Sequence, residues 1–362
     1  MNDLGSVLAT RRDFLKRSVA AGIAVALCKP IAGASAGNVQ TILGPLDASR
    51  LGFTLPHEHI ASAPDVLNRW PKSWGGRAGL IASAVDRLKT IKAAGIDTVV
   101  DLTPHDVGRD IRFLEEISRK SGMHVIACTG QRFLPTRSAK VSMSSRKIEG
   151  LAEHFTKEID RGIDGTSFKA GVIKIGIGAA RPTSLEEMGL RAAARAGKAT
   201  GVPIRIHTNA ADRAGESVAV ILEDEGVSPA RVSFDHSDDS GDLEYLLGLA
   251  RRGYFLSMDH LHRGLMRDEE PSFERRVECI RKIVDAGFAN RLFLSSDSMF
   301  GGSLLPEETR GWRENLDPPE GMLFIVRRLL PRLRELGVTE ELVHVMTVGN
   351  ARGFFSIDRR PA

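Results

Sequence analysis

The chain has 362 residues, of which 42% are hydrophobic and 27% are charged. This composition is that of a soluble globular protein, and the length allows either one large α/β barrel or two ordinary domains. The formal charge is +4, but the first 36 residues hold five Lys or Arg and two Asp or Glu, so the remaining chain carries only about +1. The basic charge of the whole chain therefore gives no reason to expect a nucleic-acid partner.

The amino-terminal segment, residues 1–36, has the layout of a twin-arginine export signal. Arg11 and Arg12 stand before DFLK, the apolar run VAAGIAVALC follows, and the small residues ASA end at Ala36. The apolar run has about ten residues, whereas a membrane-spanning helix needs about 20. We therefore expect cleavage after Ala36 and export to the periplasm or the medium, without stable insertion in the membrane.

The three cysteines do not suggest a disulfide. Cys28 lies in the predicted signal and makes a lipid anchor the alternative to release, although Leu27 is bulkier than the small residue that usually precedes a lipidated cysteine. Cys128 and Cys279 both lie in apolar segments of the remaining chain. We predict that these two are buried thiols.

Short apolar runs alternate with segments of helical periodicity from residue 53 onward. Helical segments such as AVDRLKTIKAAG and IRFLEEISRKSG end in a glycine, which is typical of a helix C-cap. The apolar runs, which we predict to be strands, cover residues 53–56, 97–102, 124–129, 171–176, 203–208, 231–236, 254–258 and 291–296.

Eight such alternations without a linker predict an α/β fold, a single TIM-type (β/α)8 barrel over residues 37–362 with a short N-terminal β segment. The alternative is a doubly wound open sheet. That fold would place a Gly-rich phosphate loop after the first strand, where this chain has LPHEHIA instead.

Polar side chains stand at the ends of five of the predicted strands, where the active face of such a barrel lies. In LPHEH, His57 and His59 share one face because strand side chains alternate, so Glu58 points away and has a supporting or structural role. Each polar residue alone has a plain structural explanation, such as a core histidine, a paired lysine or a helix-capping aspartate. Their convergence predicts a metal site instead. The other members of the set are Lys174, His207, His236 and Asp297.

The residue types fit a pair of divalent ions. Imidazole and carboxylate suit zinc and also cobalt, manganese or iron, and a catalytic site leaves one position open for water. Four histidines and one aspartate are more than one tetrahedral ion requires. Lys174 would complete the set if its neutral amine reacted with carbon dioxide, because each carbamate oxygen could then hold one metal.

The sequence resembles the phosphotriesterase family of the amidohydrolase superfamily over nearly all of residues 40–355. The stretches that carry the resemblance are GFTLPHEHI, DLTPHDVGRDI, GVIKIG, HTNAADRAGE, HSDDSGDLEYL, MDHLH, LSSDS and GMLFIVRRLLPRLRELGV. The resemblance implies that His57, His59 and Asp297 hold the more buried metal. It implies that His207 and His236 hold the more exposed one.

The resemblance also implies a bridge and a proton route. Carboxylated Lys174 and a hydroxide would bridge the two metals, and the hydroxide would attack a P=O or C=O group without a protein nucleophile. Asp297, His260 and Asp239 would form a proton relay. A surface ion pair between His260 and Asp239 is the alternative.

Two departures from the family pattern concern the substrate pocket. Arg132 stands where the resembling sequences usually carry a large aromatic residue. Met299 and Phe300 begin the segment 298–308, which lacks the aromatic residues that line the leaving-group pocket of efficient phosphotriesterases. Arg132 could pair with a carboxylate or polarise an ester oxygen if it faces the pocket, and it is otherwise a surface residue on a loop.

We expect an exported two-metal hydrolase whose small-molecule substrate is a phosphotriester of the aryl dialkyl phosphate type or a related neutral ester. A lactonase or aryl esterase with weak phosphotriesterase activity is the close alternative. A barrel that binds a metal or ligand without turnover is the alternative from another class. The family resemblance also implies a homodimer.

Overall fold

The structure is a computed structural model, and it describes residues 37–60, 76–132, 147–266, 271–299 and 320–357. The predicted export signal, Phe300 and most of segment 298–308 lie outside the described residues. No helix within the described ranges is both long enough and apolar enough to cross a membrane.

Eight parallel strands form a nearly closed barrel, which confirms the fold predicted from the sequence. Each strand pairs with the next one in the chain, and each of the eight predicted runs overlaps one strand, although β3 and β5 extend two residues beyond their predicted runs. In chain order the strands are β3 (Thr54–Glu58), β4 (Thr98–Asp101), β5 (His124–Gln131), β6 (Val172–Gly176), β7 (Ile204–His207), β8 (Val232–Asp235), β9 (Phe255–Met258) and β10 (Leu292–Leu294).

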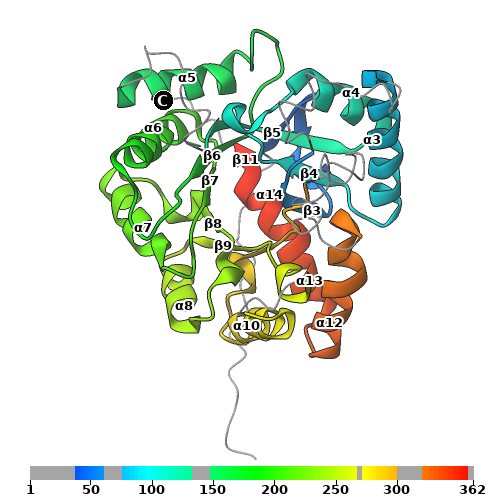
Figure 1. Ribbon diagram of the computed structural model, residues 1–362, viewed down its shortest axis with the longest axis vertical. Helices are drawn as coiled ribbons and strands as arrows, with labels where there is room; N and C mark the ends of the chain where they lie inside the picture. Colours follow the sequence, from blue (N-terminus) through cyan, green and yellow to red (C-terminus); the bar gives the residue numbers. More distant parts are fainter. Residues whose placement is uncertain (1–36, 61–75, 133–146, 267–270, 300–319, 358–362) are drawn as a thin grey trace, which may run out of the picture. The chain divides into compact units, whose positions relative to one another are not determined.

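Helices surround the strands on the outside (Figure 1). Gly122 and Gly201 end two of them in the left-handed conformation, with φ of 71° and 75°, as the glycine pattern predicts. The helices between strands are α3 (Gly76–Ala93), α4 (Ile111–Ser121), α5 (Ile148–Asp160), α6 (Ser184–Thr200), α7 (Ala214–Asp224), α8 (Leu243–Arg251), α9 (Arg263–Met266) and α10 (Phe273–Asp285). After β10 the chain continues through η10 (Ile325–Leu329), α12 (Leu330–Glu335), α13 (Glu340–His344), η11 (Val345–Gly349) and α14 (Asn350–Phe355).

A small antiparallel sheet joins the two ends of the described chain. Strand β1 (Asn38–Thr41) pairs with β2 (Gly44–Asp47) and with β11 (Ser356–Ile357). Phe354 and Phe355 of α14 are buried beside Phe255 and Phe293, which point into the barrel. The predicted N-terminal β segment is thus present, and these aromatic rings are part of an apolar cluster in the barrel interior.

Side-chain alternation decides which residues face the barrel interior. On β6, Ile173 and Ile175 pack in the cluster between the strands and the helices, whereas Val172 packs in the interior cluster. Lys174 therefore faces the interior, because it stands two residues after Val172. Cys128 also lies in the interior cluster, and Cys279 on α10 is only half-buried rather than buried as predicted. Both thiols are free.

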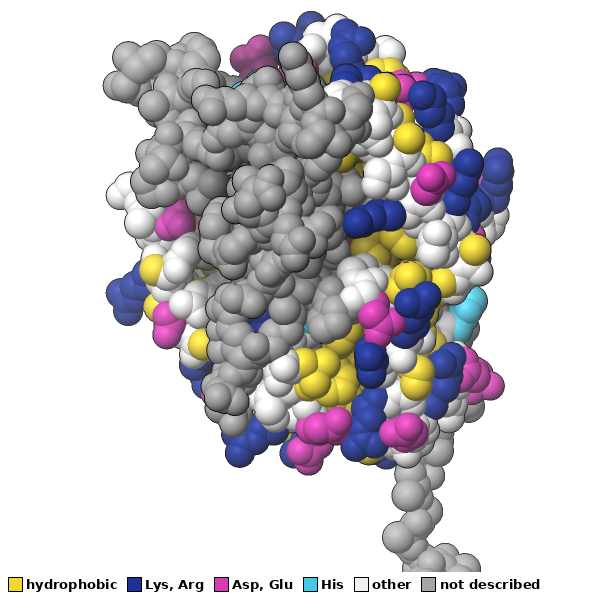
Figure 2. Space-filling model, turned by 45° about the vertical axis from the view of Figure 1, so that its right-hand side comes forward, with side chains coloured by type: hydrophobic (Ala, Val, Ile, Leu, Met, Phe, Trp, Pro, Cys, Tyr) yellow, Lys and Arg dark blue, Asp and Glu magenta, His cyan; other side chains and the backbone are white. Residues whose placement is uncertain are grey.

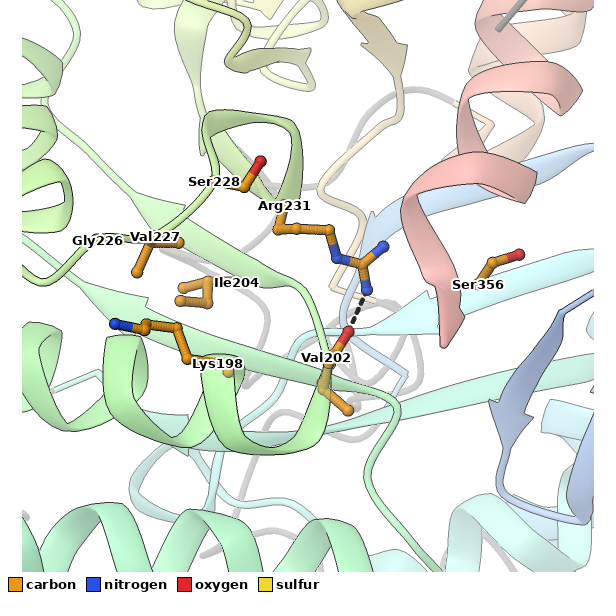
Figure 3. A pocket seen from close by; sticks show the side chains of 10 residues that line it. Lys198, Val202, Ile204, Gly226, Val227, Ser228, Arg231 and Ser356 are labelled. Carbon is orange, nitrogen blue, oxygen red and sulfur yellow. Dashed lines mark hydrogen bonds between the residues drawn. The ribbon is translucent and has the colours of Figure 1, made fainter. Parts of the chain in front are cut away.

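The amino ends of β7 and β8 border a cavity of about 420 Å³ (Figure 3). Arg231 points across this cavity and donates hydrogen bonds to the carbonyl oxygens of Gly201 and Phe354, the latter at 2.7 Å. It thereby ties the end of α6 to the end of α14. Because the active sites of such barrels lie at the carboxyl ends of the strands, we assign a structural role to this end.

The face drawn in Figure 2 carries Lys and Arg side chains interspersed with Asp and Glu. Among the described residues, several surface charges form pairs one helical turn apart, such as Arg191 with Glu187 at 2.9 Å and Lys282 with Glu278 at 3.0 Å. Exposed pairs of this kind contribute little to stability.

A buried ion pair fastens the segment after β4 to helix α5. Arg109 donates to both carboxylate oxygens of Glu158 at 2.7 and 2.8 Å and to the carbonyl oxygen of Cys128 at 2.9 Å. Burial would raise the pKa of Glu158, but Arg109 and the Thr129 hydroxyl lower it below its usual value. A depressed folded-state pKa gives stability that is present above the unfolded pKa of about 4.3 and is lost as pH falls through the folded value.

We predict that Glu158→Gln lowers the free energy of unfolding by about 2–4 kcal/mol at pH 7, because among the described residues the buried Arg109 then keeps only the more distant Asp164, 3.4 Å away, as a counter-charge. The deficit should narrow below about pH 4, where Glu158 of the unchanged protein also becomes protonated. Urea unfolding at both pH values measures this. Glu278→Gln, which breaks an exposed pair, is the control, and an equal loss in the two variants would contradict the prediction.

Candidate metal centre

The first strand supplies two imidazoles to the carboxyl end of the barrel. His57 Nε2 lies 3.5 Å and His59 Nε2 lies 3.2 Å from Oδ1 of Asp297. The register of β3 against β4 shifts between Leu55 and Glu58, and such an irregularity re-aims side chains near active sites. His57 and His59 therefore converge on one point, as the LPHEH pattern predicts.

Glu58 points away from this point and closes the barrel. Its carboxylate accepts hydrogen bonds from the hydroxyl groups of Ser295 and Ser296, at 2.7–2.8 Å, and from the backbone N–H groups of Ser296 and Ser298 at 2.8 and 2.7 Å. These bonds join the first strand of the barrel to the segment after β10. Burial raises the pKa of Glu58 to about 8, although its donors act in the opposite direction. The supporting role expected for Glu58 is thus a structural one at the barrel seam.

Asp297 lies beyond the end of β10 in a strained position. Its φ is 44°, a left-handed conformation that is uncommon for residues other than glycine. Oδ2 accepts a hydrogen bond from His260 Nε2 at 2.9 Å, whereas the buried Oδ1 has no hydrogen-bond partner among the described residues. A buried carboxylate oxygen that faces two imidazole nitrogens and has no donor is suited to a cation.

A second pair of imidazoles lies next to the first. His207 Nδ1 and His236 Nε2 are 2.7 Å apart, and His236 has a left-handed φ of 61° where the chain leaves β8. Lys174 Nζ lies 3.3 Å from His57 Nε2. One ligand atom from each of His57, His236 and Asp297 falls within a span of 4.8 Å. The structure therefore brings all six predicted ligands together, and their roles as ligands stay predictions.

The charge states of these residues suit metal binding. Burial lowers the pKa of His57, His207 and His236 well below the usual value, so each imidazole is neutral and has a free lone pair. Burial would raise the pKa of Asp297, but the nearby histidines hold it well below its usual value. Burial also lowers the pKa of Lys174, although Asp235 acts in the opposite direction. Neutral imidazoles, an ionised carboxylate and a more readily deprotonated amine fit divalent ions.

A layer of buried charges beneath these ligands was missed by the sequence analysis. Asp259 lies 2.7 Å from His57 Nδ1 and 2.8 Å from His236 Nδ1, so one carboxylate orients two of the imidazoles. Asp235 contacts Lys174 Nζ on one side, and its other oxygen lies 2.7 Å from Nη2 of Arg205. The sequence does contain a signal for these residues, because each is a charged residue inside or at the end of an apolar run. They are Arg205 in RIH, Asp235 in FDH and Asp259 in MDH.

The predicted relay residues form a continuous chain. His260 Nε2 lies 2.9 Å from Asp297 Oδ2, and its Nδ1 lies 2.7 Å from Asp239 Oδ2. Burial would lower the pKa of His260, but Asp239 and Asp297 raise it to about 10. Its ring is 2% exposed and stacks on His236 at 3.7 Å, so it is not part of a surface ion pair. Asp239 also lines a cavity of about 520 Å³.

Arg132 faces the candidate centre, which answers the question left open by the sequence. Its Nη2 lies 2.6 Å from Nε2 of His207. Met299 forms a single parallel β-bridge with His59, so it adjoins the centre through its backbone, and Phe300 lies outside the described residues.

The fold and this cluster define a (β/α)8 barrel with a candidate metal centre at the carboxyl ends of its strands. The sequence profile of the "Phosphotriesterase family" matches residues 37–355, which is nearly the whole described chain. The chain therefore belongs to the phosphotriesterase family, and its membership indicates a hydrolase.

Several known proteins are similar to most of this chain. A "Phosphotriesterase homology protein" of Mycobacterium tuberculosis is 33% identical, over 88% of this chain and 97% of its own. An "Aryldialkylphosphatase" of Saccharolobus solfataricus is 30% identical, over 86% and 97%. An "N-acetyltaurine hydrolase" of Rattus norvegicus is 28% identical, over 85% and 94%. A solved structure described as "Molecular Engineering of Organophosphate Hydrolysis Activity from a Weak Promiscuous Lactonase Template" has 31% identity and a TM-score of 0.76, over 88% and 100%.

We predict that Asp259→Asn weakens metal binding by about 10- to 100-fold, because an amide can accept from only one of the two histidine Nδ1 groups that it must orient. Metal content after dialysis against graded chelator concentrations measures the effect. Asp285→Asn, on the exposed side of α10, is the control. Unchanged metal content in Asp259→Asn would show that His57 and His236 do not need this carboxylate.

Proposed function

We propose that the chain is a hydrolase that uses two divalent metal ions to hydrolyse a phosphotriester or a related neutral ester. The observation that carries the proposal is the buried Oδ1 of Asp297, which has no hydrogen-bond partner among the described residues and faces His57 and His59. His207 and His236 offer a second pair of nitrogens beside it. Zinc, or else cobalt, manganese or iron, would polarise the P=O or C=O oxygen and supply hydroxide near neutral pH.

The chain's own residues would handle the proton that this hydrolysis releases. Both ring nitrogens of His260 face a carboxylate oxygen. When the ring is neutral and carries its proton on Nδ1, it can accept a proton from Asp297 at Nε2 and then release the Nδ1 proton to Asp239. Asp239 is partly exposed, at 25%, and can pass the proton on to solvent. We propose this order of transfer from the distances alone.

Lys174 is the candidate for the bridging group. Its amine is buried beside His57, and burial lowers its pKa, which favours the neutral form that reacts with carbon dioxide. The resulting carbamate would keep one N–H group, for which the carboxylate of Asp235 is the adjacent acceptor. We therefore propose that Lys174 is carboxylated and that Asp235 orients it.

The names of the relatives support several substrate classes. The relative named for aryl dialkyl phosphates supports a phosphotriester, and the structure described as a lactonase template supports a lactone or aryl ester. The relative named for N-acetyltaurine adds a carboxylic amide whose acid portion carries no charge and whose amine portion carries a sulfonate. A barrel that binds metal without turnover is the remaining alternative.

We predict two metal ions per chain, with loss of metal and of hydrolysis on addition of a chelator. Elemental analysis and a substrate panel of an aryl dialkyl phosphate, γ- and δ-lactones, phenyl esters and N-acetyltaurine, compared by kcat/KM, test this. Asp297→Asn should lose activity toward every substrate. Full metal content with no turnover on the panel would favour a binding protein, and a preference for lactones by several orders of magnitude would make the chain a lactonase rather than a phosphotriesterase.

We predict that His260→Ala lowers kcat by about 10²- to 10⁴-fold, because the proton taken up by Asp297 loses its route to Asp239. The comparison is made across the pH range with metal content held equal. His154→Ala removes a half-exposed histidine on α5 and is the control. Unchanged rates over the whole pH range would remove His260 from the proton route.

A further inference from the structure

Arg132 is a half-buried cation without an acidic partner at the edge of the candidate centre. The only acceptor of its guanidinium among the described residues is the neutral His207 ring, and no described carboxylate forms an ion pair with it. Burial lowers the pKa of Arg132, although the more distant Glu186, Asp106 and Asp297 act in the opposite direction. A guanidinium with five N–H donors is expensive to bury when only one of them has an acceptor.

Neighbouring residues nevertheless fix the position of the Arg132 side chain. The backbone N–H of Arg132 donates to both oxygens of Asp106, at 3.0 and 3.1 Å, so that carboxylate fixes the position of the residue without neutralising its guanidinium. Gly176, at the end of β6, leaves the space for the side chain, because a Cβ there would lie 2.6 Å from Arg132 Cδ and 2.7 Å from Nη1. Two separate elements thus hold Arg132 toward the centre.

The contact with His207 cannot persist when that histidine binds a metal. His207 Nδ1 is the nitrogen that converges with His236 Nε2, so it is the one available to a cation. A neutral imidazole that binds through Nδ1 carries its proton on Nε2, which is then a donor. Arg132 Nη2 is also a donor, and two donors cannot share a hydrogen bond. In the metal-loaded protein the guanidinium therefore needs another acceptor.

We infer that Arg132 is the specificity-determining residue of this site and that the substrate carries a compact oxyanion, such as a carboxylate or sulfonate, near the bond that is hydrolysed. Arginine binds such groups through two parallel N–H bonds. The inference rests on the proposed hydrolase function and narrows it, since a substrate with an added anionic group is favoured over an uncharged one. The same contact would place the reacting bond beside the His207 and His236 pair.

A matched pair of esters tests the inference. Phenyl hydrogen succinate and phenyl methyl succinate contain the same phenyl ester, but only the first has a free carboxylate. The metal-loaded protein should hydrolyse the charged ester with the higher kcat/KM. Arg132→Met should lower kcat/KM for the charged ester by about 10- to 100-fold and change it little for the capped ester, because only the charged ester loses a charge-assisted hydrogen bond. Arg132→Lys should retain part of the preference.

Binding of an inert anion gives a readout that does not depend on turnover. Ethanesulfonate is a poor metal ligand, and its Kd for the metal-loaded protein, measured by calorimetry, should rise at least about tenfold in Arg132→Met. Arg112→Met removes an exposed arginine on α4 and is the matched control, with no change expected in either measurement. Metal content is measured for every variant.

The outcomes separate the two proposals. Hydrolysis of both esters at rates that Arg132→Met lowers equally would overturn the inference and leave the hydrolase function standing. Ethanesulfonate binding that is equal in Arg132→Met and the unchanged protein would also overturn it. Anion binding that depends on Arg132, together with no hydrolysis of any ester or amide, would support the anion site and reject the hydrolase function.

Discussion

The ion pair between Arg205 and Asp235, enclosed in the barrel, is the interaction on which the arrangement of the candidate centre depends. Two carboxylates, Asp235 and Asp259, lie under the ligands with no exposure to solvent, and a pair of unshielded anions at that depth would be strongly unfavourable. Arg205 compensates for them from below, where it also packs over the ring of Phe293 at 5.2 Å. Asp235 can then form its contact with Lys174, and Asp259 can accept hydrogen bonds from His57 and His236. The barrel interior thus changes from apolar at one end to charged at the other within a few residues of each strand.

The centre itself is a place where polar groups are left incompletely satisfied. Among the described residues, Oδ1 of Asp297 and the Nε and Nη1 atoms of Arg205 have no hydrogen-bond partner, and the guanidinium of Arg132 has only the neutral ring of His207 as a partner. Two of the non-glycine residues with left-handed φ, His236 and Asp297, are candidate ligands. Strain and unsatisfied groups of this kind persist only where the surrounding packing holds them, and they gather at functional sites.

Much of the fold and part of the candidate centre could be predicted from the sequence, because the sequence patterns that indicate them are local. The eight apolar runs, the glycine caps and the alternation in LPHEH depend on neighbouring residues, and the structure confirms the strands and the side to which His57 and His59 point. The inner charges could not be paired from the sequence, since Arg205, Asp235 and Asp259 come from three strands and meet only when the barrel closes. The conformations of His236 and Asp297 were missed as well, because strict alternation would turn His236 away from the site and the left-handed turn after β8 reverses that. The direction of the Arg132 side chain could not be predicted either, because the space that it occupies is left by Gly176, which is distant in the sequence.

The seam between the first and last strands has a mechanical consequence. His57 and His59 lie on one side of it and Asp297 on the other, and the hydrogen bonds across it join residues as far apart in the chain as His57 and Ser295. A cation held by these three residues would cross-link the first strand to the segment after the last one. It would then reduce the conformational entropy of the unfolded chain between them, as a disulfide over the same span does. The three residues come together only when the first and last strands meet, so closure of the barrel forms the cation site. A bound cation would in turn stabilise the closed barrel. The hydrogen bonds of Glu58 give the seam a second fastening that needs no ion, so the strands can meet before a cation arrives.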